Sequence, residues 1–148
     1  MCKRHAGLVP VGALIVGLVA VAGCGGGDDE LTKAEFLKQG NAICAKGNKE
    51  INQAANKVFT SKQEPSQAQL NKFAENTLIP SVQGQVDDLR DLNPPSELDD
   101  QVSSLLDDAE AALDKGKADP SILTSDKQDP FKDVNQTAEK LGLKACGS

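Results

Sequence analysis

Histidine is almost absent from this sequence of 148 residues, and tryptophan and tyrosine are missing altogether. The one histidine is His5, and the one methionine is Met1. From residue 24 onward the chain therefore has no imidazole for a catalytic triad, a proton shuttle or a zinc site, and no usual axial ligand for haem. These absences remove the commonest catalytic side chain and argue against a haem carrier.

The short motifs that mark common enzymes are also missing. The sequence contains no G-x-S-x-G, S-x-x-K, H-E-x-x-H or C-x-x-C motif and no phosphate-binding glycine loop. We therefore expect a protein that is not an enzyme and that needs no metal and no cofactor. An enzyme that uses only carboxylates, serine or lysine is the alternative, and it would require a convergent pair of carboxylates in a pocket.

What the sequence does have is an N-terminal segment typical of exported proteins. Lys3 and Arg4 precede an apolar run that ends at Val21, and this run is shorter than the about 20 apolar residues that a helix needs to cross a bilayer. Val21, Ala22, Gly23 and Cys24 then resemble the lipobox of bacterial lipoproteins. In that family a diacylglycerol is attached to the cysteine and a peptidase cuts just before it.

The resemblance implies that residues 1–23 are a lipoprotein signal peptide and that Cys24 is the acylated first residue of the mature protein. An ordinary secretory peptide with an incidental cysteine is the alternative. Two acyl chains would hold the protein firmly in a lipid bilayer, whereas one chain anchors only marginally. We expect a cell-membrane location, on the extracytoplasmic face.

The mature chain would be acidic. Loss of Lys3 and Arg4 from a chain of formal net charge −6 leaves −8. So acidic a protein is a poor partner for nucleic acid, whose phosphates attract Lys and Arg. Anionic lipid headgroups would also repel it, so the lipid on Cys24 would have to hold it at the membrane.

Two further cysteines remain after the signal peptide and the lipidation site are set aside. Cys44 and Cys146 would be the only thiols in an exported, oxidising context, so we predict that they form a disulfide. Two free, buried thiols are the alternative.

The remaining sequence predicts an all-α domain, an antiparallel four-helix bundle at residues 32–148 that follows a flexible tether at 24–31. Capping boxes at Thr32 and Ser66 open the first two helices, the first ending near residue 60. The apolar face of the first helix includes Ile51, Ala54 and Val58. Pro80 predicts a kink near 76–80 or a short break in the second helix, and Pro94-Pro95 ends this helix. No segment shows the alternation of a strand.

The third helix is predicted from Ser96 to Gly116, with Leu98, Leu105 and Leu113 on its buried face. Asp129 as the cap and Pro130 as the first helical residue predict the start of the fourth helix. A short helical turn is possible between 117 and 129. Gly40 and Gly47 lie on the buried stripe of the first helix, where they would admit a close neighbouring helix or, as the alternative, a ligand groove.

Acidic residues are concentrated in the stretch 84–114, which has ten acids and one base. On the third helix they recur opposite the leucines, as a solvated face requires. The alternative is a site for a cationic partner or a weakly bound divalent ion, although the spacing does not match an EF-hand loop.

Three segments resemble a group of small exported helical lipoproteins of actinobacteria. They are LTKAEFLKQGNAICAKGNKEI at 31–51, LNPPSE at 92–97 and GLKACG at 142–147. The resemblance covers nearly the whole mature chain, including both cysteines. It implies the helical fold, the disulfide and the location, but it supplies no activity.

Two functions from different classes fit these observations. The first is a non-catalytic, membrane-anchored module that binds a partner, such as an envelope protein, or supports an envelope assembly. The second is a carrier that holds an apolar small molecule or a lipid in the core of the bundle. A core with unfilled space would favour the carrier.

Overall fold

The computed structural model describes residues 30–59, 64–125 and 128–147. The regular secondary structure of this part of the chain is all helical, and no strand is present among these residues. The signal peptide, Cys24 and most of the tether lie outside the described residues. Among those that are described, none of the helices has the length and apolar character needed to cross a membrane.

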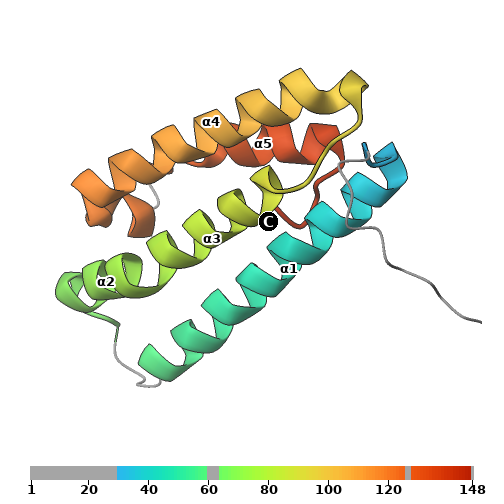
Figure 1. Cartoon of the computed structure of the whole chain (residues 1–148). Helices are drawn as coiled ribbons and strands as arrows, with labels where there is room; N and C mark the ends of the chain where they lie inside the picture. Colours follow the sequence, from blue (N-terminus) through green and yellow to red (C-terminus); the bar gives the residue numbers. More distant parts are fainter. Residues whose placement is uncertain (1–29, 60–63, 126–127, 148) are drawn as a thin grey trace, which may run out of the picture.

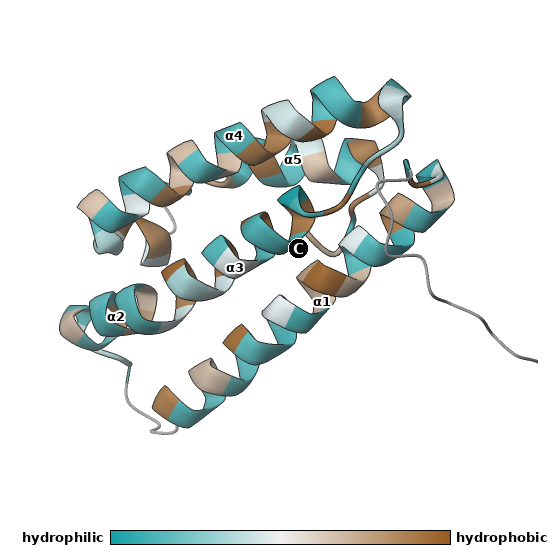
Figure 2. Ribbon diagram, viewed as in Figure 1, coloured by the Kyte–Doolittle hydropathy of each residue, from teal (hydrophilic) through white to brown (hydrophobic). Residues whose placement is uncertain are grey.

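Four helical rods form an antiparallel bundle, as the sequence predicted. The first rod is α1 (Lys33–Val58). The second is one continuous run of α2 (Gln67–Phe73), η1 (Ala74–Leu78) and α3 (Ile79–Arg90). The third is α4 (Ser96–Ala118) and the fourth is α5 (Lys132–Leu141). In Figure 1, α3 lies between α1 and α4, and α5 lies against α4. The hydrophobic sides of the helices turn toward one another (Figure 2).

Both predicted capping boxes are present. Thr32 accepts a hydrogen bond from the backbone N–H of Glu35, whose carboxylate accepts one from the backbone N–H of Thr32. Ser66 and Gln69 make the same reciprocal pair at the start of α2. These bonds satisfy backbone donors that have no partner inside a helix, and so they fix where each helix begins.

The kink predicted near Pro80 is a π-helical turn, and the helix continues through it. Pro80 has no backbone N–H and its ring crowds the preceding turn. The hydrogen-bond register widens there, so that the N–H of Ile79 donates to the carbonyl of Ala74, five residues back. The helix therefore bends without breaking, and Leu78 and Ile79 lie in the bend.

The fourth helix begins two residues later than predicted. Asp129 accepts a hydrogen bond from the N–H of Phe131, but Pro130 and Phe131 form a turn and α5 starts at Lys132. The Asp129 side chain closes this turn instead of capping the helix. At the other end, Gly142 has a φ of 97° and closes α5 as predicted.

The segment 117–129 contains a short 3-10 helix, η2 (Pro120–Thr124), whose Leu123 packs on Gly116. α4 itself continues to Ala118, two residues beyond the predicted end. Its predicted core residues Leu98, Leu105 and Leu113 are all buried. The acids on its opposite face are exposed.

Both glycines of the α1 stripe admit close neighbours, as predicted. A Cβ at Gly47 would lie 2.3 Å from the side chain of Gln85 on α3, and one at Gly40 would lie 2.6 Å from Leu143 and 3.2 Å from Leu89. Leu143 belongs to the segment after α5, so the neighbour at Gly40 is only partly a helix. The absent side chains let α3 and the chain end approach the α1 backbone.

The start of α1 is attached to the turn between α3 and α4. The backbone N–H of Leu31 donates to the carbonyl of Asn93 at 2.9 Å. The Glu30 carboxylate accepts a hydrogen bond from the backbone N–H of Ser96. The N-terminal residues therefore enter the bundle at the end that holds the 92–96 turn, and η2 lies at the opposite end, against α2 and η1.

Candidate functional site: a cavity between four helices

Cys44 and Cys146 form the predicted disulfide, so the alternative of two free thiols is wrong. Their Cα atoms lie 5.0 Å apart and the bond spans 102 residues of sequence. Cys44 is buried in the middle of α1, and Cys146 lies in the segment that follows α5. The bond therefore joins the end of the chain to the middle of its first helix.

Two asparagines on the same side of α1 hold the segment around this bond. Asn41 donates to the carbonyl of Gly142 at 2.9 Å and accepts from the N–H of Ala145 at 2.8 Å. Asn48, two turns further on, donates to the carbonyl of Ala145 at 2.7 Å. The chain end is thus tied to α1 by side-chain hydrogen bonds on both sides of Cys44.

The role of these asparagines was not predicted from the sequence. The signal was present, because Asn41, Cys44 and Asn48 recur at helical spacing and so share one side of the helix. A polar residue on each side of a predicted disulfide cysteine indicates that another backbone segment lies there and needs hydrogen-bond partners.

α1 and α5 are joined through this segment more than by direct packing of the two helices. α3 packs on both α1 and α4, and α5 packs on α4. The buried residues of α1 are Phe36, Gly40, Cys44 and Gly47, and none lies beyond Gly47. Beyond Gly47, therefore, no side chain of α1 is buried in the core of the bundle.

Val58 illustrates this arrangement and corrects the sequence-based expectation. It was predicted on the buried face, but 46% of its surface is exposed. Ile51 and Ala54, predicted on the same face, are only half-buried. The periodicity identified the inward side of α1, but within the described residues no element buries Ile51, Ala54 or Val58 on that side.

A cavity of about 690 Å³ occupies the space left between α1, α3, α4 and α5. This volume lies within the range of about 300–1,000 Å³ that is typical of small-molecule sites. Apolar side chains of α3 and α4 line its deep part, among them Val86, Leu105, Ala109 and Leu113. The disulfide lies in one wall, since both Cys44 and Cys146 line the cavity.

The polar lining residues come mainly from the two helices at the open side. Asn48 and Asn52 belong to α1, Asn135 belongs to α5, and Asp129 begins the turn that leads into that helix. Gln85 of α3 is the fifth. Asn52 and Asp129 are exposed, so the cavity reaches the molecular surface between the second half of α1 and the start of α5.

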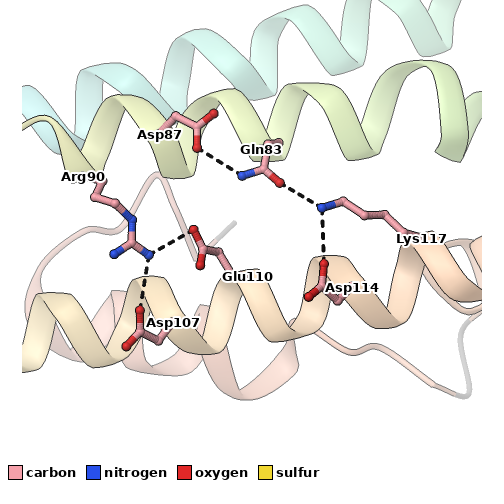
Figure 3. Close-up of polar contacts among 7 residues, drawn as sticks. All are labelled: Gln83, Asp87, Arg90, Asp107, Glu110, Asp114 and Lys117. Atoms are coloured by element: carbon pink, nitrogen blue, oxygen red, sulfur yellow. Dashed lines mark hydrogen bonds and ion pairs between the residues drawn. The ribbon is translucent and has the colours of Figure 1, made fainter.

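The acidic side chains of the stretch 84–114 do not line the cavity, and Figure 3 shows four of them, Asp87, Asp107, Glu110 and Asp114, at the contact between α3 and α4. Arg90 of α3 contacts Asp107 at 3.3 Å and Glu110 at 3.1 Å on α4. Lys117 of α4 contacts Asp114 and the side chain of Gln83 on α3. The contacts of Arg90 and the contact between Lys117 and Gln83 link α3 to α4, and each exposed ion pair contributes little to stability.

Hydrogen bonds to neighbouring side chains shift the pKa values of Arg90 and Glu35. The side-chain hydrogen bond to Asp107 raises the pKa of the Arg90 guanidinium, and the hydrogen bonds with Thr32 lower the pKa of Glu35. Across residues 30–59, 64–125 and 128–147, no charged or polar side chain is buried. The same ranges contain no cluster of three or more His, Cys, Asp or Glu side chains that could hold a metal.

No protein-family model matches the chain, and no curated protein or solved structure is significantly similar to it.

Proposed function

We propose that this protein is a non-catalytic lipoprotein of the extracytoplasmic membrane face that carries an apolar molecule in its helical bundle. The cavity between α1, α3, α4 and α5 is the observation that carries this proposal. Its deep wall is apolar, its volume suits a small ligand, and one side is open. Of the two functions compatible with the sequence, the unfilled space favours the carrier.

Apolar burial supplies the driving force for such binding. A ligand that enters the cavity removes its own apolar surface from water, which is worth roughly 25 cal/mol per Å². Side chains such as Val82, Phe131 and Val134 line the cavity and are only half-buried, so a ligand would cover them too. Binding would need little rearrangement, because the space is already present between the packed helices.

The lipobox supports the anchoring part of the proposal. Cys24 would carry the lipid, and the tether would join it to Leu31, beside the turn between α3 and α4. The open side of the cavity is formed by the second half of α1 and the start of α5, toward the η2 end of the bundle. The ligand would then be exposed away from the anchored end.

A fluorescent probe tests the carrier function. Phenylnaphthylamine is an uncharged fluorophore that brightens in apolar surroundings, and a chain without tryptophan or tyrosine adds no interfering emission. We expect saturable binding of one probe per molecule to residues 25–148. Ala109→Leu places a larger side chain in the cavity and should abolish binding. Ala111→Leu, an exposed position of the same helix, is the matched control.

Absence of saturable binding, or equal binding by the Ala109→Leu protein, would argue against the carrier. The anchor is tested separately by the intact mass of the protein made from the full gene in a lipoprotein-processing host. We expect cleavage before Cys24 and the added mass of diacylglycerol. A Cys24→Ala chain should lose both, and an unmodified thiol in the unaltered protein would contradict the anchor.

A further inference from the structure

The polar side chains that line the cavity are mostly uncharged. Four of them are carboxamides, from Asn48, Asn52, Gln85 and Asn135, and one is the carboxylate of Asp129. No lysine, arginine or histidine is among the residues that line the cavity. Carboxamides both donate and accept hydrogen bonds, whereas a bound anion would need donors and a compensating positive charge.

Two of these carboxamides are available to a ligand. Within the part of the chain that the structure describes, the side chains of Asn52 and Asn135 make no hydrogen bond to another residue. They belong to α1 and α5, the helices on either side of the opening. Gln85 donates to the carbonyl of Ser81, which leaves its own oxygen to accept.

The deep part of the cavity offers different chemistry. Leu105, Leu106 and Leu113 of α4 and Val86 and Leu89 of α3 line it and are buried. A bound molecule would therefore meet hydrocarbon at the inner end and amides at the outer end. This is the polarity of an amphiphile held with its chain inward and its head at the opening.

We propose that the ligand is an uncharged amphiphile, with a hydrocarbon chain against α3 and α4 and a hydroxyl- or amide-bearing head between Asn52 and Asn135. The inference rests on the carrier function proposed above and specifies its ligand class. An anionic head would meet no cation in the lining, and it would approach the exposed carboxylate of Asp129 in a protein of negative net charge. A cationic head would lose hydration at the carboxamides and gain only that one exposed carboxylate.

Three photoreactive probes with the same hydrocarbon chain test the head-group preference. One ends in a glycerol ester, one in a sulfonate and one in a trimethylammonium group, and each carries a diazirine in the chain. The mature acylated protein is reconstituted in phosphatidylcholine vesicles that contain one probe, irradiated and digested. Mass spectrometry then measures labelling of the α3 and α4 peptides.

We expect the glycerol ester to label these peptides about tenfold more than either charged probe, a ratio that corresponds to about 1.4 kcal/mol. Asn52→Leu combined with Asn135→Leu should reduce the ratio to near one. Gln53→Leu with Gln136→Leu changes exposed neighbours outside the cavity lining and should leave the ratio unchanged.

The outcomes separate this inference from the function on which it rests. Equal labelling by all three probes, blocked by Ala109→Leu, would overturn the head-group preference and leave the carrier intact. Stronger labelling by the sulfonate or the ammonium probe would also overturn it. Labelling by no probe above the level of the Ala109→Leu protein would overturn the carrier and the inference together.

Discussion

Leu143 lies directly over Gly40, so closely that a Cβ on the glycine would come within 2.6 Å of a methyl group of the leucine. Leu143 is 1% exposed and Gly40 is buried. The N–H of Leu143 donates to the carbonyl of Ala138 as the chain turns at Gly142. The turn thus directs Leu143 onto α1, a few residues before the disulfide.

A matched pair of glycine substitutions tests this contact. Alanine inside a helix is favoured over glycine by roughly 0.5–1 kcal/mol, but at Gly40 it would displace Leu143 and Leu89, and overpacking of this kind typically costs about 1–3 kcal/mol. We expect Gly40→Ala to lower the free energy of unfolding by about 1 kcal/mol. Gly84→Ala should raise the free energy of unfolding, because a Cβ at Gly84 would have no neighbouring atom within 4 Å.

Urea unfolding followed by circular dichroism measures both changes. Stabilisation by Gly40→Ala equal to that by Gly84→Ala would show that Leu143 does not pack as described.

Removal of the disulfide should destabilise the fold strongly. The Cys44–Cys146 bond closes a loop of about 100 residues, for which the loop-entropy model gives up to roughly 4.7 kcal/mol. We expect Cys44→Ala with Cys146→Ala to lose about 2–5 kcal/mol in urea unfolding. A reductant should destabilise the unaltered protein by a similar amount and leave the double variant unaffected. A loss below measurement error would contradict this account.

Asn41→Ala should weaken the attachment of the chain end to α1. It leaves the carbonyl of Gly142 and the N–H of Ala145 without their Asn41 partner, and a buried polar group that loses its partner costs about 1–3 kcal/mol. Because the site is partly buried, we expect a loss near 1 kcal/mol and faster hydrogen exchange at Ala145. Gln39→Ala, on the exposed side of α1, is the control. Unchanged exchange at Ala145 would contradict the assigned hydrogen bond.

Partial filling of the cavity should stabilise the unliganded protein. Ala109 is 5% exposed and lines the cavity, so the added carbons of Ala109→Leu would be buried in existing space. Cavity filling commonly adds about 0.5–2 kcal/mol. The same variant should lose ligand binding, so stability and binding change in opposite directions. A destabilisation greater than that of Ala111→Leu would show that the space beside Ala109 is already filled.

Much of the fold follows from local signals in the sequence. The capping boxes at Thr32 and Ser66 fix the starts of two helices because they pair side chain and backbone within one turn. Cys44 and Cys146 could be paired by elimination. The start of α5 was misplaced because Asp129 and Pro130 suit both a helix start and a turn, and the turn forms.

The cavity could not be predicted from periodicity. The pattern placed Ile51 on the inward side of α1, and Ile51 lines the cavity while remaining partly exposed, as do Leu78, Val82, Phe131 and Val134. Periodicity reports which way a side chain faces, but not whether a partner fills the space before it. The composition does carry a signal for the cavity, because large side chains are scarce: the sequence has four phenylalanines and no tryptophan or tyrosine.

The most direct test of the carrier function is native mass spectrometry of the mature protein purified from membranes of the organism that produces it. The account predicts one non-covalently bound amphiphile per molecule, in addition to the lipid on Cys24, and its loss from the Ala109→Leu protein. A wild-type protein that carries only its covalent lipid, in every growth state sampled, would contradict the account.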